Sequence, residues 1–285
     1  MIQIQDHQIV PDSVSTKFSY EASDNHSGLF RSGLPDTIVI HYTAGASYNS
    51  SVSWLKDRQA KASAHLVVGR GGEVVQLVSF DTVAWHAGRS QWQGRTGLNQ
   101  YSIGIEIANA GKLERRANGF YTSFGSKIAD DKVVLATHKH GDTEQAWEAF
   151  TPEQVACVED LCIAIMNAYS IKDIVGHDDI APGRKTDPGP AFPLEALRSK
   201  LLFSRADDDE EAMDDEVQLG DGVQGIVTAS LLNIRNAPNR QAPTVASPLQ
   251  QGTRITHIQT HDEWIKVKVE TEGWVKGSFV KLVER

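Results

Sequence analysis

The stretch GHDDIAPGRKTDPG, residues 176–189, carries the most information in this sequence. It brings His177, Lys185 and Asp187 into a span of eleven residues, and its glycines and prolines disfavour a helix there. An imidazole and a carboxylate ten positions apart can bind the same Zn²⁺ if the loop between them folds back. Lys185 would then lie beside the metal. A catalytic zinc site has three protein ligands and an open position, so a third ligand has to come from elsewhere.

That third ligand is predicted at the end of an apolar run. Residues 37–40 read Thr-Ile-Val-Ile and are followed by His41, a pattern that indicates a buried strand over residues 37–42 with a polar side chain near its end. A second strand is predicted at residues 102–107, where isoleucines alternate with other residues. Successive side chains of a strand point to opposite faces, so Glu106 is expected on the face away from the isoleucines.

Strand and helix patterns are interspersed over the first two hundred residues or so. Further strands are predicted at residues 64–68 and 73–78, which flank a Gly-Arg-Gly-Gly hairpin signal, and at residues 175–177. Helices are predicted at residues 51–59 and 194–202, and after Thr151, which is followed by Pro152 and Gln154 in the pattern of a capped helix start. These elements predict an α/β domain with a central mixed β-sheet flanked by helices.

A change of composition divides the chain. Residues 204–224 contain nine acids and one base and few large apolar side chains, so this segment cannot bury enough surface to fold alone. We expect a catalytic domain at residues 1–203, an acidic flexible linker at 204–224 and a small all-β domain at 225–285. In the last part, short β-type runs are predicted at residues 226–234, 253–259, 264–269, 273–276 and 279–283.

Five segments of the first domain resemble, in order, the zinc-dependent N-acetylmuramoyl-L-alanine amidases of the type 2 class, which share their fold with peptidoglycan recognition proteins. The segments are IHYTAG (residues 40–45), SAHLVVGRGGEVVQLV (63–78), AWHAG (84–88), SIGIEIANAG (102–111) and the stretch at 176–189. The resemblance implies hydrolysis of the amide between N-acetylmuramic acid and L-alanine in peptidoglycan. It implies zinc as the cofactor, with His41, His177 and Asp187 as the ligands.

The same resemblance suggests roles for further residues. Glu106 would act as general base and acid, and Lys185 would stabilise the oxyanion that forms on the amide carbonyl. His86, Asn109 and Trp85 would contact the substrate. His65 is expected to be structural, and the His138-x-His140 pair is not needed for the ligand set.

The last part of the chain resembles a bacterial SH3-like domain. The resemblance rests on LLNIRNAPN (residues 231–239), LQQGTRI (249–255), EWIKV (263–267) and EGWVKGSFV (272–280). Such a barrel would hold the catalytic domain on the cell wall, so the partners expected are peptidoglycan or muropeptides.

Composition excludes other classes of partner. The net charge is −9 and no basic cluster suggests nucleic-acid binding. No apolar run approaches a membrane span, and the first residues, MIQIQDHQIVPDS, lack the pattern of a signal peptide. We therefore expect a monomer made in the cytoplasm that acts on the wall after release without a signal peptide.

Two alternatives stay open. A cytoplasmic recycling amidase acting on soluble anhydro-muropeptides would also need no signal peptide, although the wall-binding type of domain argues against it. A non-catalytic peptidoglycan recognition protein is the alternative of another class. Such proteins typically lose a zinc ligand, whereas here all three positions and Glu106 are filled.

Overall fold

The computed structural model describes residues 2–10, 17–206, 224–227, 231–232, 234–239, 242, 245–246, 249–250, 253–261 and 264–269. The chain divides into two compact units, Met1–Leu202 and Phe203–Arg285. Most of the predicted acidic linker lies outside the described residues, as do the two strands predicted at residues 273–276 and 279–283.

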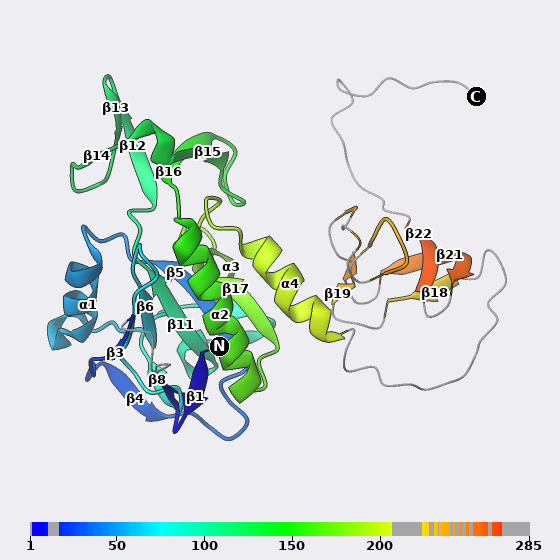
Figure 1. Ribbon diagram of the computed structural model, residues 1–285, viewed down its shortest axis with the longest axis horizontal. Helices are drawn as coiled ribbons and strands as arrows, with labels where there is room; N and C mark the ends of the chain where they lie inside the picture. The colour runs from blue at the N-terminus through cyan, green and yellow to red at the C-terminus, as the bar shows by residue number, and fades with distance from the viewer. Residues whose placement is uncertain are drawn as a thin grey trace. The chain divides into compact units, whose positions relative to one another are not determined.

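A six-stranded mixed sheet forms the centre of the first unit (Figure 1). The strands lie in the order β17 (Asp173–Gly176), β5 (Thr37–Tyr42), β11 (Ser102–Ile107), β6 (Leu66–Val68), β7 (Val74–Gln76) and β3 (Phe18–Tyr20). The first four run parallel, β6 and β7 form an antiparallel hairpin, and β3 is parallel to β7. The predicted mixed sheet is therefore confirmed, and β5 and β11 have the predicted bounds.

Helices cover both faces of this sheet. On one face, α2 (Pro152–Ala168) packs Val158, Leu161 and Ile165 into the apolar cluster that also contains Ile40 and Ile105. Its start is capped as predicted, because Gln154 N donates to Thr151 Oγ1 at 3.1 Å and Thr151 N donates to Gln154 Oε1 at 3.1 Å. The same cluster takes in α4 (Leu194–Ala206). No helix among the described residues is long and apolar enough to cross a membrane.

On the other face, α1 (Tyr48–Lys56) packs Val52 and Leu55 against Val67 and Val75. This helix begins three residues earlier than predicted, because Ser47 caps it: Ser50 N donates to Ser47 Oγ at 3.1 Å. A short 3₁₀ helix, η1 (Arg58–Ala60), follows.

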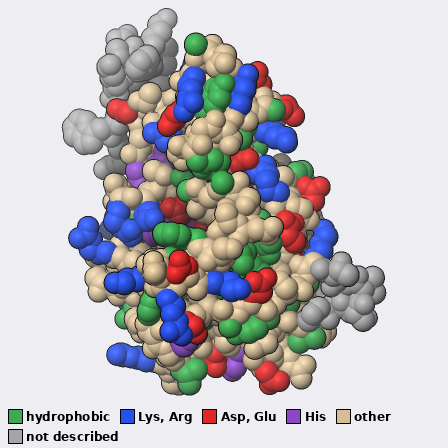
Figure 2. All heavy atoms as spheres, turned by 90° about the vertical axis from the view of Figure 1, so that its left-hand side faces the viewer, with side chains coloured by type: hydrophobic (Ala, Val, Ile, Leu, Met, Phe, Trp, Pro, Cys, Tyr) green, Lys and Arg blue, Asp and Glu red, His purple; other side chains and the backbone are tan. Residues whose placement is uncertain are grey.

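A five-stranded antiparallel sheet, which the sequence did not predict, lies between β11 and α2 in the chain. Its order is β14 (Lys127–Ile128), β13 (Gly119–Tyr121), β12 (Lys112–Arg116), β16 (Glu144–Glu148) and β15 (Val133–Thr137), and we call it the insert sheet. On the face drawn in Figure 2, Lys and Arg side chains flank apolar ones at the top, where this sheet lies. The guanidinium of Arg116 lies 4.5 Å from the centre of the Tyr121 ring.

Short elements complete the first unit. They are β1 (Gln3–Gln5), β2 (Gln8–Val10), β4 (His26–Leu29), β8 (Thr82–Ala84), β9 (Gln91–Trp92), β10 (Arg95–Thr96), η2 (Leu98–Gln100), α3 (His177–Ile180) and η3 (Asp130–Lys132). The pairs β1–β2, β4–β8 and β9–β10 form two-stranded ribbons.

From residue 224 onward, the helices and strands that the structure describes are all strands. These are β18 (Gln224–Ile226), β21 (Arg254–His261) and β22 (Trp264–Val269) in one sheet, with β19 (Leu231–Leu232) paired to β20 (Leu249–Gln250). Val227, Leu249 and Ile255 form a small buried cluster. The single run predicted at residues 226–234 is wrong, because it contains parts of two separate strands.

Candidate metal centre

Strand register brings two histidines from distant parts of the chain together. β17 pairs with β5 so that Gly176 is opposite Ile40, and the next residue of each segment is a histidine. His41 and His177 are both buried, and their ring centres lie 4.5 Å apart. The ends of two paired strands therefore position both side chains. The apolar run that leads to His41 predicts this position for His41.

His177 begins a single helical turn, α3, rather than a loop. The prediction that the stretch at 176–189 contains no helix is wrong at this point. Asp179 Oδ2 accepts a 2.7 Å hydrogen bond from Gly176 N and caps the turn, and two acids in a first turn suit the positive end of a helix. The glycines and prolines that disfavour a helix come only after Ala181.

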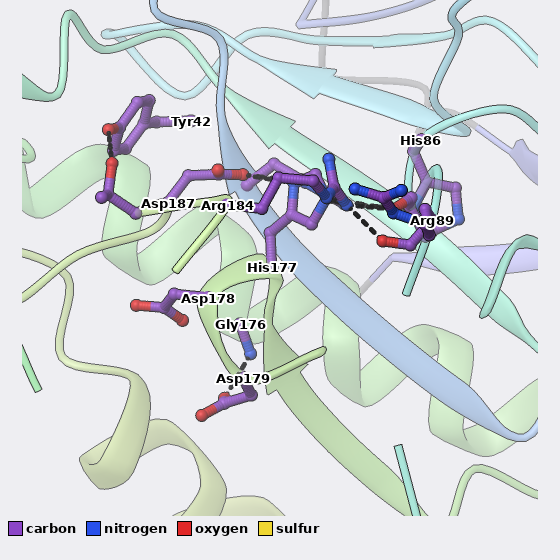
Figure 3. Close-up of polar contacts among 12 residues, drawn as sticks. Tyr42, His86, Arg89, Gly176, His177, Asp178, Asp179, Arg184 and Asp187 are labelled. Carbon is purple, nitrogen blue, oxygen red and sulfur yellow. Dashed lines mark hydrogen bonds and ion pairs between the residues drawn. The ribbon is translucent and has the colours of Figure 1, made fainter. Parts of the chain in front are cut away.

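The loop after α3 folds back, as the ligand spacing requires. Asp178 N donates to Asp187 O at 2.8 Å, which closes the loop and returns Asp187 to His177. Figure 3 shows the Asp187 carboxylate and the His177 ring directed toward each other. Asp187 Oδ2 lies 3.0 Å from His41 Nδ1 and 2.9 Å from His177 Nδ1, and the two Nδ1 atoms are 2.9 Å apart.

These three atoms fit a zinc ion. Nitrogen and carboxylate oxygen are ligands that zinc accepts, with bonds of about 2 Å, and all three atoms are close enough to share one ion. They form the one such cluster of His, Cys, Asp and Glu side chains found among the described residues. With three protein ligands the fourth position stays open, which is the pattern of a catalytic site.

The electrostatics favour a neutral imidazole and an ionised carboxylate, the forms that bind a metal. Burial and then the neighbouring His177 lower the pKa of His41 to about 4, against the effect of Asp187. Burial raises the pKa of Asp187, but hydrogen bonds to His177 and His41 outweigh it, and the pKa is lower than usual.

Glu106 lies next to this cluster. On β11 it is the register partner of His41 on β5, so both side chains are on the same face of the sheet. Among the described residues its buried Oε2 atom has no hydrogen-bond partner. Burial and then the charge of Asp187 raise the pKa of Glu106 well above its usual value, and Lys185 opposes this. An unpaired carboxylate oxygen in such a place can take up a proton.

Lys185 lies on the returning loop, where its amide donates to Ala181 O at 3.0 Å. Its side chain is partly exposed, and its charge acts on both His41 and Glu106. The structure thus brings together His41, His177, Asp187, Glu106 and Lys185.

Two of the three residues predicted to contact substrate, His86 and Asn109, are buried and bonded to other residues of the protein. His86 is buried behind His41, with its Nδ1 atom 3.0 Å from His41 Nε2. Asn109 is buried, its amide donates to Glu148 O, and its Oδ1 accepts from Gly111 N at 2.7 Å. Contact of these two side chains with substrate stays a prediction.

Trp85 and His65 were also singled out by the sequence. Trp85 is partly buried and donates its indole N–H to Ser27 Oγ at 2.6 Å, and its contact with substrate stays a prediction. His65 is wholly buried, with Nε2 2.9 Å from Thr82 O and Nδ1 accepting from Gly104 N at 3.0 Å. The structural role expected for His65 is confirmed.

Sequence reasoning missed the support of α3 by the insert sheet. His138 Nε2 lies 3.0 Å from Asp178 Oδ2, and Lys139 Nζ lies 2.9 Å from Asp178 Oδ1 and 2.6 Å from Asp179 Oδ1. His140 Nε2 lies 3.0 Å from Asp178 O. We call residues 138–140 the strap. The complementary charges of Asp178-Asp179 and His138-Lys139-His140 were the available signal.

Three buried donor atoms, an adjacent carboxylate with a raised pKa and a nearby lysine are the parts of a metal-dependent hydrolase site. The family model described as N-acetylmuramoyl-L-alanine amidase matches residues 31–190, which include all five of these residues. The chain belongs to this family.

The chain is similar to two amidases of Escherichia coli (strain K12). It is 36% identical over 169 residues to N-acetylmuramoyl-L-alanine amidase AmiD, which covers 56% of this chain and 51% of AmiD. It is 39% identical over 145 residues to 1,6-anhydro-N-acetylmuramyl-L-alanine amidase AmpD, which covers 51% of this chain and 60% of AmpD. The chain thus spans about half to three fifths of the length of these relatives.

A solved structure that matches is AmiD from E. coli in complex with the substrate anhydro-N-acetylmuramic acid-L-Ala-D-gamma-Glu-L-Lys. The identity is 30%, the match covers 69% of this chain and 64% of that chain, and the TM-score is 0.44.

Proposed function

We propose that this protein is a zinc-dependent amidase that cleaves the bond between N-acetylmuramic acid and L-alanine. The observation that carries the proposal is the triangle of His41 Nδ1, His177 Nδ1 and Asp187 Oδ2, with Glu106 as the neighbour of His41 on the sheet. All of these residues lie in the segment that matches the amidase family.

In the proposed mechanism, the bound zinc would acidify a water molecule and polarise the amide carbonyl. Glu106, whose Oε2 atom has no hydrogen-bond partner in the described part of the chain, would accept the proton of the attacking water and pass it to the nitrogen of the leaving L-alanine. A carboxyl group with a raised pKa holds a proton more readily than an ordinary one, which suits the second step.

Lys185 would stabilise negative charge on the carbonyl oxygen. Lys185 is half-buried and its charge acts on both His41 and Glu106, so we place it at the rim of the same site. A fixed positive charge stabilises the transition state when charge develops close to it.

The substrate can be the wall polymer or a soluble muropeptide, and the two amidases compared above carry names of both kinds. We favour the polymer because residues 225–285 resemble an SH3-like domain, and the regular elements described from residue 224 onward are all strands. In this proposal the second unit binds the wall and the first unit cuts it. The soluble anhydro-muropeptide stays the second candidate.

Identification of the reaction products tests the proposed activity on both candidate substrates. Purified protein with zinc is incubated with intact sacculi and, separately, with soluble anhydro-muropeptides, and the products are identified by mass spectrometry. Release of free stem peptides that begin with L-alanine is expected. Cleavage between sugars or within the peptide would overturn the proposal, and so would binding without cleavage, which would indicate a recognition protein.

A further inference from the structure

A backbone carbonyl fixes the protonation of one ring nitrogen of His86, Nε2. His86 Nε2 lies 3.2 Å from Ser102 O, and a carbonyl oxygen can only accept a hydrogen bond. Ser102 Oγ, which already donates to Leu98 O at 2.6 Å, lies 3.4 Å from the same nitrogen and can also only accept. His86 therefore carries its proton on Nε2, and Nδ1 is left as an acceptor.

The tautomer of His86 determines which ring nitrogen of His41 carries the proton. His86 Nδ1 lies 3.0 Å from His41 Nε2, and a contact between these two nitrogens is a hydrogen bond only if His41 donates from Nε2. His41 Nδ1, on the other side of the ring, then keeps its lone pair. That atom is the one that faces His177 and Asp187.

Ala87, the residue after His86, determines the tautomer of His177 through its backbone carbonyl. His177 Nε2 lies 3.2 Å from Ala87 O and 3.4 Å from Arg184 Nη2, which can only donate. The contact to the carbonyl is the shorter of the two, and in it His177 donates from Nε2 and keeps the lone pair of Nδ1. Arg184 donates to the same carbonyl at 3.0 Å, which fixes the position of the acceptor.

We infer that residues 86–87 set the tautomers of both histidine ligands of the proposed zinc site. His86 is a positioning residue that acts through its side chain on His41, and Ala87 acts through its carbonyl on His177. The lone pairs of two nitrogens and a carboxylate oxygen then point toward one place, and this arrangement is favourable only around a cation. The inference rests on the proposed zinc site but not on the identity of the substrate.

The surroundings hold this segment in place. Asn99 Oδ1 accepts from His86 N at 3.1 Å and from Ala87 N at 2.6 Å. The His86 ring lies directly over Gly104, where an added Cβ would come within 2.3 Å of the ring. These contacts orient the ring toward His41, and partners of this kind are known to change metal affinity by about 10- to 100-fold.

The experiment measures zinc affinity by competition with a chromogenic chelator. His86→Phe keeps a ring but removes the acceptor, and we expect it to bind zinc about 10- to 100-fold more weakly than the wild type. His86→Asn places a side-chain oxygen near the position of Nδ1 and should restore most of the affinity. His65→Phe is the matched control, because it removes a buried imidazole bonded only to backbone atoms and should leave zinc affinity unchanged.

A measurement on the wild type adds a test that needs no substitution. Long-range ¹H–¹⁵N spectra of the zinc-loaded protein should show protonated Nε2 atoms on His41, His86 and His177. Equal zinc affinity of folded His86→Phe and wild type, or a proton on His86 Nδ1, would overturn the inference. Absence of zinc binding by the wild type would instead overturn the proposed function.

Discussion

Glu106 on β11 and His41 on β5 are direct register partners in adjacent parallel strands. The proposed base and a proposed zinc ligand therefore start from neighbouring Cα positions on one face of a rigid sheet. The separation of the two side chains is set by the spacing between strands and not by a loop. Glu106 can thus be altered with little effect on the metal ligands.

Removing two ligands tests the metal site. The wild type should bind one zinc per chain, and the His177→Ala, Asp187→Ala double variant should lose it, because only His41 would remain of the donor triangle. Zinc content is measured by elemental analysis after dialysis. Chelation should abolish hydrolysis by the wild type and added zinc should restore it, whereas full occupancy in the double variant would sink the ligand assignment.

Replacing Glu106 by Gln tests the proton transfer. Zinc should stay bound while turnover falls by about 10²- to 10⁴-fold, because the amide cannot act as a base. Glu144→Gln on the insert sheet is the control, since it makes the same change at an exposed strand position. Near wild-type turnover by zinc-loaded Glu106→Gln would rule out Glu106 as the base.

Replacing Lys185 by Ala tests the oxyanion role. We expect kcat to fall by about 10²- to 10³-fold with a smaller change in KM. Lys172→Ala, at an exposed position following α2, should change neither. A change confined to KM would make Lys185 a substrate-binding residue instead.

The buried His65 predicts a pH dependence of stability in the zinc-free protein. Burial lowers the pKa of His65 to about 4, against 6.5 for an ordinary histidine. Between these values the unfolded chain binds a proton that the folded protein does not, so stability falls as the pH falls from 6.5 toward 4.

Urea unfolding across this range measures the effect. The loss attributable to His65 is up to about 3 kcal/mol, and His65→Phe should show a correspondingly shallower decline. Equal slopes for the two proteins would show that His65 does not make this contribution. The absolute stability of the variant is not the readout, because it also loses the hydrogen bonds to Thr82 and Gly104.

Removing the second unit tests its role in targeting. A chain ending at Ala206 keeps the whole of α4 and every residue of the proposed site. Activity on small soluble muropeptides should be almost unchanged, while binding and clearing of sacculi should fall because a second contact raises the local concentration of enzyme. Equal clearing by both proteins would favour the soluble substrate.

The parts of this molecule that the sequence predicted are those determined by local pattern. The apolar run before His41 and the alternating isoleucines around Glu106 gave the bounds of β5 and β11. The short spacing from His177 to Asp187 predicted a returning loop, which the structure confirms.

What the sequence did not predict depends on contacts between distant segments. β12, with the sequence KLERR, has largely exposed side chains and lacks the apolar alternation of a strand, so the insert sheet was missed. The role of His86 follows from atoms of His41 and Ser102, which only the folded sheet brings together. The turn at His177 is held by the side-chain cap from Asp179 and by contacts from the strap, a distant segment of the chain.

The strap has a consequence for how small this enzyme can be made. Asp178 is buried next to a proposed ligand, and its carboxylate contacts His138 and Lys139 from the insert sheet. A shortened protein that kept the six-stranded sheet and deleted residues 112–148 would contain every proposed ligand. It would also remove both contacts of the Asp178 carboxylate, directly beside His177. We therefore expect the smallest working unit to include the insert sheet, although none of its described residues is a proposed zinc ligand.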